Sequence, residues 1–172
     1  MKRLWLILFL LLIVGCSKEP EKPRTIVDIG GVYYILGTDG IYKQPYSGVM
    51  TKDIGRGLIE ETTVKDGKKD GLFTRRFEDG QKEEEGTYKD GDRDGLWTVW
   101  YKNGQKIEEG TYKDGDRDGL YTYWYVNGPK QSEYIYMDGN LLTQECWDED
   151  GNECLCFDND IFDIYTDIRW CQ

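Results

Sequence analysis

Residues 95–118 read Gly-Leu-Trp-Thr-Val-Trp-Tyr-Lys-Asn-Gly-Gln-Lys-Ile-Glu-Glu-Gly-Thr-Tyr-Lys-Asp-Gly-Asp-Arg-Asp. Residues 71–94 are a near copy and share the ending Glu-Glu-Gly-Thr-Tyr-Lys-Asp-Gly-Asp-Arg-Asp. A looser copy spans residues 119–142, and residues 48–70 form a weaker copy that is one residue shorter. A fixed period of 24 residues predicts a repeat architecture.

Each copy has the pattern of one β-hairpin. Leu96–Tyr101 is rich in aromatic and β-branched residues, and Asn103-Gly104 follows as a two-residue turn that tolerates positive φ at both positions. Gln105–Tyr112 is the expected return strand, and Asp114-Gly115 turns the chain toward the next copy. The sequence therefore predicts an all-β fold, an elongated antiparallel meander of stacked hairpins in a single-layer sheet.

A two-residue loop also sets which side chains face each other across a hairpin. It places Trp97 opposite Gly110, and the same count places Phe73 opposite Gly86. An aromatic ring over a cross-strand glycine shields an otherwise weak piece of backbone, so the recurrence of this pairing favours the register. Three further pairs follow: Tyr101 with Lys106, Arg75 with Glu84, and Arg76 with Glu83.

The N-terminus has the features of an export signal. Met1–Arg3 is basic, and the eleven apolar residues Leu4–Val14 fit a signal-peptide core but fall short of the roughly 20 residues of a membrane-spanning helix. Ile13-Val14-Gly15-Cys16 resembles the lipobox of bacterial lipoproteins. The resemblance implies cleavage before Cys16 and acylation of that cysteine with fatty acids such as palmitate; the alternative is an ordinary signal peptide with a chance cysteine.

The residue after the lipobox and the following segment suggest where the protein resides. Ser17, rather than aspartate, resembles lipoproteins sorted to an outer membrane, which implies a lipid-anchored location in the cell envelope. Residues 16–24 hold two prolines and alternating charges, and are expected to form a tether. Residues 25–47 are expected to form an N-terminal capping hairpin, residues 48–142 four repeats, and residues 143–172 a cysteine-rich C-terminal cap.

Four cysteines lie in the C-terminal cap, at positions 146, 154, 156 and 171. An even number in an exported chain predicts disulfides. A Cys154–Cys156 bond would close a very tight ring, so we expect Cys146 to pair with one of these two and Cys171 with the other. A Cys₄ metal site is the alternative, but Cys-x-x-Cys spacing is absent and the compartment is oxidising.

Composition narrows the function. The chain has no histidine, which removes Ser–His–Asp and Cys–His catalysis in their usual forms and His-based zinc sites. Its carboxylates recur with the repeat, whereas a catalytic acid needs surroundings unlike those of its neighbours. We therefore predict a protein that is not an enzyme and uses no cofactor or metal. The formal net charge of −11 argues against nucleic acid and permits a basic protein partner.

The repeated residues carry a family resemblance. Tyr46-x-Gly48, then Gly-x-aromatic, an Asn-Gly or Asp-Gly turn and Gly-x-Tyr-Lys-Asp-Gly, resembles the bacterial variant of the MORN repeat. The similarity extends from Tyr46 to about Glu153. It implies a scaffold that binds proteins or lipids, with relatives grouped as an antitoxin-like family. The repeat motif carries no catalytic residue that could be transferred to this chain.

Two non-catalytic functions remain open. The first is a membrane-anchored scaffold for protein interaction, with an antitoxin or immunity role as a special case. The alternative is a cell-wall module that binds choline or glycans between aromatic rings. The same rings are expected to stack between hairpins and hold the sheet together. The candidate contact aromatics are Trp97, Trp100, Tyr101, Tyr121, Tyr123, Trp124 and Tyr125.

Overall fold

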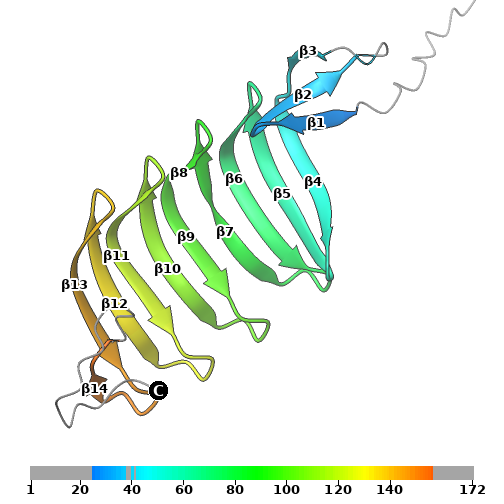
Figure 1. The fold of residues 1–172 in the computed structure, drawn as a ribbon. Helices are drawn as coiled ribbons and strands as arrows, with labels where there is room; N and C mark the ends of the chain where they lie inside the picture. Colours follow the sequence, from blue (N-terminus) through cyan, green and yellow to red (C-terminus); the bar gives the residue numbers. More distant parts are fainter. Residues whose placement is uncertain (1–24, 38–39, 41, 157–172) are drawn as a thin grey trace, which may run out of the picture.

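The computed structural model describes residues 25–37, 40 and 42–156. Every regular element in these residues is a β-strand, and neighbouring strands are antiparallel, which confirms the predicted fold class (Figure 1). The strands are β1 Ile26–Ile29, β2 Val32–Leu36, β3 Tyr42–Pro45, β4 Gly48–Gly55, β5 Leu58–Lys65, β6 Lys68–Phe77, β7 Lys82–Lys89, β8 Asp92–Arg93, β9 Gly95–Trp100, β10 Lys106–Lys113, β11 Asp116–Trp124, β12 Lys130–Met137, β13 Asn140–Trp147 and β14 Glu153–Cys154.

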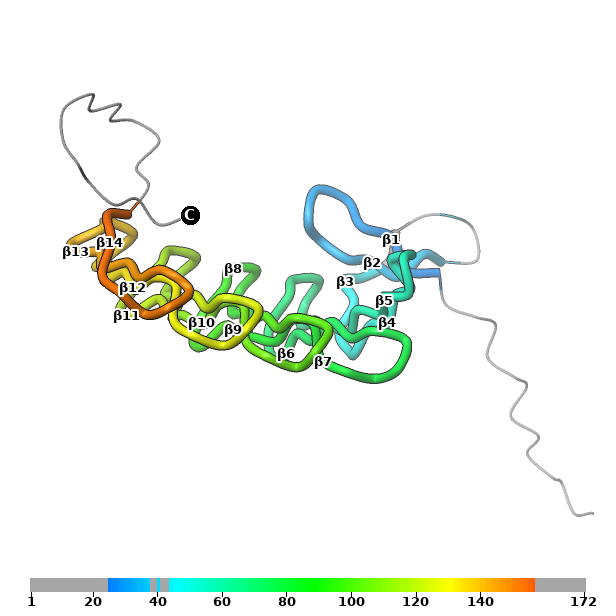
Figure 2. The backbone as a smooth tube through the Cα atoms, turned by 90° about the horizontal axis from the view of Figure 1, so that it is seen from below, coloured from blue at the N-terminus to red at the C-terminus, as the bar shows by residue number. Residues whose placement is uncertain are grey.

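The larger sheet follows the order of the chain. It runs from β4 through β5, β6, β7, β9, β10, β11, β12 and β13 to β14, and β8 pairs with β7 beside this path. Both views show a long single layer of successive hairpins (Figures 1 and 2). Since each strand pairs with strands adjacent in sequence, the sheet is built from local hairpins.

The turns at one end of the hairpins, here called the inner turns, lie at the predicted positions and have primed geometry. Asp114 and Gly115 both have positive φ, 49° and 92°. The same pair of signs recurs at Asp66-Gly67, Asp90-Gly91 and Asp138-Gly139. The Gly115 N–H donates to the carbonyl of Arg93 at 3.0 Å, so the inner turn of one repeat is bonded to the preceding repeat.

The turns at the other end, the outer turns, differ from the prediction. The Gly104 N–H donates to the Tyr101 carbonyl at 2.9 Å, and the Tyr101 N–H donates to the Gln105 carbonyl at 2.8 Å. The loop therefore has three residues, 102–104, and only Gly104 has positive φ, at 85°. The predicted two-residue primed turn at Asn103-Gly104 is wrong, because the side chain of Asn103 accepts the Gln105 N–H at 3.0 Å and stabilises the longer turn.

The longer loop changes the register near the turn but not in the middle of the hairpin. Lys106 lies opposite Trp100, so the expected pairing with Tyr101 is wrong. Between Lys106 and Glu108 the ladder shifts by one residue, which makes Ile107 a β-bulge. The bulge offsets the extra loop residue, and the predicted pairing of Trp97 with Gly110 is confirmed.

The preceding hairpin, β6–β7, repeats this compensation. The pairings of Phe73 with Gly86 and of Arg75 with Glu84 are confirmed. The ladder then shifts, so Arg76 lies opposite Lys82 and its expected pairing with Glu83 is wrong. In the hairpin β11–β12, Tyr134 stands where Gly86 and Gly110 stand in the two preceding hairpins, and it lies opposite Tyr121.

The N-terminal residues form a second, small sheet. Its order is β1-β2-β3, so this region has three strands where a single capping hairpin was expected. The Tyr33 N–H donates to the Gly67 carbonyl and the Gly67 N–H donates to the Tyr46 carbonyl, each at 2.7 Å. The N-terminal segment thus supplies hydrogen-bond partners for the backbone N–H and carbonyl of Gly67 in the first inner turn, which has no preceding repeat.

The core lies along one face of the large sheet. Phe73, Trp97 and Tyr121, 24 residues apart, are 2%, 1% and 0% exposed, and we call their side the ring face. Leu72, Leu96 and Leu120 immediately precede them and point to the opposite side, here called the leucine face. A single-layer sheet can bury these rings because neighbouring repeats cover them.

Candidate interaction surface

The buried rings form a ladder that joins the repeats. Phe73 and Trp97 are stacked, with centroids 5.2 Å apart and an interplanar angle of 19°. Tyr88 meets both edge-on, with centroids 5.6 and 5.3 Å away. The Trp97 ring lies directly on Gly86, where a Cβ atom would stand 1.9 Å from it. The glycine is required by this close approach, since its own φ is not positive.

Positively charged side chains already occupy the faces of these rings. The guanidinium carbon of Arg93 lies 4.0 Å from the Trp97 centroid, and that of Arg117 lies 4.5 Å from the Tyr121 centroid. Lys69, at the same repeat position, places its Nζ 5.4 Å from the Phe73 centroid. The cation–π sites of the ladder are therefore filled from within the chain.

Glu84 is the buried acid of the ring face, at 7% exposure. It accepts the indole N–H of Trp97 at 2.7 Å and forms ion pairs with Arg75 at 2.5 Å and Arg93 at 3.2 Å. Arg75 also reaches Glu60 at 3.5 Å. These partners compensate the buried carboxylate, so removing one of them would leave an uncompensated buried charge at the repeat interface.

The next repeat replaces this ion cluster with tyrosines. Arg117 donates to the hydroxyls of Tyr123 and Tyr136 at 3.1 and 3.0 Å. Burial, together with the nearby carboxylate of Glu108, raises the pKa of Tyr123 to about 12. The hydroxyl is therefore neutral at physiological pH and serves as a hydrogen-bonding group.

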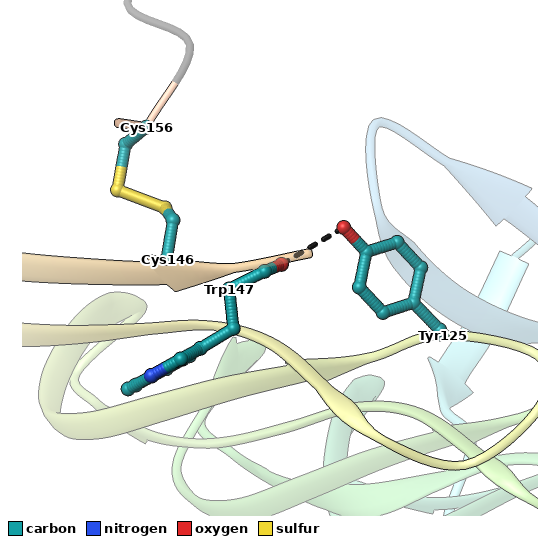
Figure 3. The surroundings of a disulfide bond; sticks show 4 residues. All are labelled: Tyr125, Cys146, Trp147 and Cys156. Atoms are coloured by element: carbon teal, nitrogen blue, oxygen red, sulfur yellow. Dashed lines mark hydrogen bonds between the residues drawn. A yellow bond between two sulfur atoms is a disulfide. The ribbon is translucent and has the colours of Figure 1, made fainter. Parts of the chain in front are cut away.

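The remaining predicted aromatics also contact neighbouring repeats. The hydroxyls of Tyr101 and Tyr125 donate to the carbonyls of Trp124 and Trp147 at 3.2 and 2.9 Å, and Figure 3 shows the second of these bonds. Trp100 has the Nζ of Lys82 5.6 Å from its ring centroid. Trp124 has the Nζ of Lys106 at 5.5 Å.

The structure thus separates the seven candidate contact aromatics. Trp97 and Tyr121 are buried. Tyr123 is half-buried, and its hydroxyl accepts a hydrogen bond from Arg117. Trp100, Tyr101, Trp124 and Tyr125 are half-buried and bonded or packed between repeats. All seven take part in the contacts that hold the sheet together.

The opposite, leucine face presents apolar side chains to solvent. Leu72, Leu96 and Leu120 are 54%, 57% and 51% exposed. Val49 and Ile135 continue the stripe at the two ends, at 63% and 43%. Aliphatic side chains alternate with threonines where the register pairs Val49 with Thr63, Leu72 with Thr87 and Leu96 with Thr111. These leucines were not among the predicted contact residues, although their 24-residue spacing is visible in the sequence.

Charged side chains beside this stripe neutralise one another. Each repeat has a Lys–Glu pair three residues apart: Lys82–Glu85 at 2.7 Å, Lys106–Glu109 at 2.5 Å and Lys130–Glu133 at 2.5 Å. Thr98 donates to Glu109 at 3.1 Å, which orients the carboxylate across the strands. The leucine stripe therefore runs beside a neutral polar row and repeats about every 10 Å, the width of two strands.

The C-terminal end of the sheet carries a disulfide. Cys146 on β13 is bonded to Cys156, with 5.3 Å between the Cα atoms (Figure 3). This confirms that Cys146 pairs with one of the two nearby cysteines. Cys154 is also disulfide-bonded, and Cys171 lies outside the described residues.

Two other predicted features, the lipidation site and the tether, fall on residues that the structure does not describe. Cys16, the expected lipidation site, and the tether at 16–24 lie outside the described residues. Within the described part, no group of three or more Cys, Asp or Glu side chains is arranged to hold a metal ion. That part also has no helix of the length and apolarity needed to cross a membrane.

The fold and the periodic contacts define an elongated, single-layer β-hairpin repeat protein. Residues 69–90 and 93–114 each match the family model described as "MORN repeat variant". These two stretches of the chain are therefore similar to that repeat. The matched segments correspond to the hairpins β6–β7 and β9–β10 of the ring ladder.

Comparison with whole proteins adds little to this assignment. No curated protein matches the chain. Among solved structures it is similar to the S. aureus TarM G117R mutant in complex with Fondaparinux, alpha-GlcNAc-glycerol and UDP, at 11% identity and a TM-score of 0.27. The alignment covers 70% of this chain and 21% of that chain. A TM-score this low carries no argument about fold or function.

Proposed function

We propose that this protein is a non-catalytic scaffold for protein interaction, tethered to a membrane through a lipid on Cys16. The observation that carries the proposal is the solvent-exposed stripe of Leu72, Leu96 and Leu120 on the leucine face. An exposed row of apolar side chains with a polar border is a candidate surface for binding another protein. The stripe is regular because each repeat contributes one leucine to it.

The distribution of cations argues against the alternative, a choline- or glycan-binding module. Such a module needs ring faces open to the ligand. Here Arg93 covers Trp97 and Arg117 covers Tyr121, and both rings are buried. A protein partner on the leucine face needs none of these rings to be free.

An antitoxin or immunity role is a special case of this scaffold. The MORN repeat variant and the net charge of −11 are compatible with a basic partner such as a toxin. A gene for such a toxin beside the gene for this protein would support this case, and purified complex formation with its product would test it directly.

The scaffold function is tested by replacing the three leucines of the stripe with threonine, the residue that lies opposite Leu72 and Leu96 on the neighbouring strands. Leu72→Thr, Leu96→Thr and Leu120→Thr in one chain introduce a β-branched residue of high strand propensity at each position and remove the exposed aliphatic surface. At about 1 kcal/mol lost per leucine, binding is expected to weaken on the order of 100-fold. The measurement is cross-linking of the tagged full chain in envelope fractions.

Val126→Thr is the matched control, because Val126 is 57% exposed in an outer turn away from the stripe. We expect cross-linked partners with the wild type and Val126→Thr, and their loss in the triple variant. The same cross-links in all three proteins would contradict the proposed surface.

The membrane tether is tested separately. Cys16→Ala removes the expected acylation site, so the protein is expected to appear in the soluble fraction after cell lysis. Fractionation of wild type and variant, with mass spectrometry of the N-terminal peptide, checks the expectation. Membrane retention of the variant in full amount would contradict lipid anchoring.

A further inference from the structure

The first strand of the large sheet, β4, has one edge without a strand beside it. Among the described strands, β4 pairs only with β5, whereas the opposite end of the sheet closes with the two-residue strand β14 and a disulfide. β4 is eight residues long, and most of it is exposed. A long free edge of this kind is a template for pairing with another chain unless something blocks it.

The backbone of β4 presents its free groups at defined positions. The hydroxyl of Tyr46 donates to the Val49 carbonyl at 2.9 Å, so the peptide group of Val49 points away from β5. Because the direction alternates along an antiparallel strand, the N–H and C=O groups of Thr51 and Asp53 also point outward. Thr51 therefore lies at the centre of the open edge.

A cavity of about 440 Å³ lies between this strand and the small N-terminal sheet. Ile26, Asp28 and Tyr33 line it from the small sheet, and Met50, Lys52 and Glu60 line it from the large one. Met50 and Lys52 are two residues apart and share the ring face. Alternate side chains of a strand added beside β4 would enter this cavity.

The polar groups of the cavity indicate which side chain it accepts. Asp28 accepts the Gly31 N–H at 2.9 Å and has no ion pair among the described residues. Glu60 shares its charge with Lys69 at 3.9 Å and Arg75 at 3.5 Å. Burial, and then the carboxylates of Asp28 and Glu60, raise the pKa of Tyr33. The wall formed by the small sheet thus carries an aromatic ring and the carboxylate of Asp28, which has no ion pair within the described part of the chain.

We propose that the open edge of β4 binds an extended segment of a partner protein as an additional antiparallel strand, with a Lys or Arg of that segment placed between Tyr33 and Asp28. Backbone hydrogen bonds to Thr51 supply affinity, and the cavity supplies the preference for a basic side chain. An apolar residue two positions away packs against Ile26 and Met50. This site shares Val49 with the end of the leucine stripe but uses none of Leu72, Leu96 and Leu120, so its test is independent of the test of the scaffold function proposed above.

The probe is an acetylated, amidated seven-residue peptide of alternating threonine and valine with one central arginine. Its binding to the full chain is measured by fluorescence anisotropy, beside a glutamate version and a version methylated on alternate backbone amides. We expect the arginine peptide to bind at least about tenfold more tightly than the glutamate peptide, a difference of about 1.4 kcal/mol. Backbone methylation is expected to abolish binding, because it removes the donors that pair with β4.

Protein variants separate the edge from the charge. Thr51→Pro removes the outward N–H at an edge position where proline is tolerated, and Thr51→Val is its matched control. Loss of binding in Thr51→Pro alone, and loss of the arginine preference in Asp28→Asn, are the expected results. The methylated peptide gives the same information without altering the protein, should Thr51→Pro fail to fold.

Three outcomes would overturn the proposal. The first is no detectable binding of the arginine peptide to the wild type. The second is binding that survives in folded Thr51→Pro and with the methylated peptide, which would exclude strand addition. The third is a wild-type dimer, measured by light scattering, that Thr51→Pro converts to a monomer, because a second copy would then occupy the edge.

Discussion

At the scale of single residues, the glycines beneath the rings have the clearest physical role. Gly86 and Gly110 do not need positive φ. They are required because Trp97 and Tyr121 occupy the space where a Cβ atom would stand, at 1.9 and 2.0 Å. Their function is to let a ring of the following repeat lie flat on the backbone.

Gly110→Ala is therefore expected to destabilise the protein by about 2 kcal/mol, the cost of forcing a ring out of a packed position. Urea unfolding followed by tryptophan fluorescence measures the change. Gly104→Ala is the control, since a Cβ there meets nothing within 4 Å and only the positive φ of 85° opposes it, a cost of about 1 kcal/mol. Equal losses for the two variants would contradict the packing explanation.

Tyr123 gives the protein a defined response to alkaline pH. Its pKa is raised to about 12 in the folded protein, against about 10 in an unfolded chain. The folded state therefore retains this proton longer than the unfolded state does, so its contribution to stability is complete below pH 10 and is lost as pH rises toward 12. We expect the thermal midpoint to fall across this range.

Tyr123→Phe removes the titrating hydroxyl and its bond from Arg117. Its midpoint is expected to be lower than that of the wild type at pH 8 and to fall less steeply between pH 10 and 12. Calorimetric scans at intervals across this range test the difference. Parallel curves for the two proteins would show that Tyr123 is not the group responsible.

At the scale of the elements, each hairpin uses two kinds of turn that differ in what they require. The inner turns need positive φ at an aspartate, as at Asp114 with φ 49°. The outer turn of β9–β10 confines positive φ to Gly104 and adds a β-bulge at Ile107, whereas the outer turn of β4–β5 has positive φ at both Arg56 and Gly57. The bulge and the longer loop cancel, so every repeat returns to the same register.

Asp114→Val tests the inner turn. A β-branched residue in the left-handed region costs about 1–2 kcal/mol, so the unfolding midpoint in urea should decrease. Asp114→Gly at the same site should leave stability within about 0.5 kcal/mol of the wild type, because glycine adopts positive φ freely. A valine variant as stable as the glycine variant would show that the turn tolerates another geometry.

At the scale of the whole molecule, the protein is a row of hairpins in which each pairs mainly with its neighbours. Stability in such an array is a sum of local terms, and the ends are its weakest parts. The two ends differ, and at the N-terminal end the edge of β4 has no strand paired with it among the described residues. The N-terminal end carries the small sheet bonded to Gly67, and the C-terminal end carries the Cys146–Cys156 bond.

Removal of this disulfide should therefore act locally. The double variant Cys146→Ser and Cys156→Ser loses a cross-link that closes a short loop, worth about 3 kcal/mol in chain entropy. Hydrogen exchange is expected to accelerate in β13 and β14 while β5–β7 stay protected as in the wild type. Uniform acceleration across all strands would instead indicate one cooperative unit.

The sequence by itself determined the repeat, the all-β class and the cross-strand register of Phe73 with Gly86 and of Trp97 with Gly110. It could do so because period, alternation and turn residues are local properties. The rings that lie on these glycines are instead Trp97 and Tyr121, from the following repeat. The outer-turn geometry, the bulge at Ile107 and the third N-terminal strand required the tertiary structure. A loop that is one residue longer and a bulge of one residue shift the strand register in opposite directions. The pairings in the middle of the hairpin are therefore the same as those predicted for a two-residue loop without a bulge.

The roles of the two faces were likewise decided only by the assembled sheet. Trp97 and Tyr121 looked like contact residues in the sequence, yet the next repeat buries them and Arg93 and Arg117 cover their faces. Leu96, the chain neighbour of the buried Trp97, is 57% exposed. Alternation places such neighbours on opposite faces, but which face is covered depends on side chains that arrive from other repeats, and no local pattern contains that information.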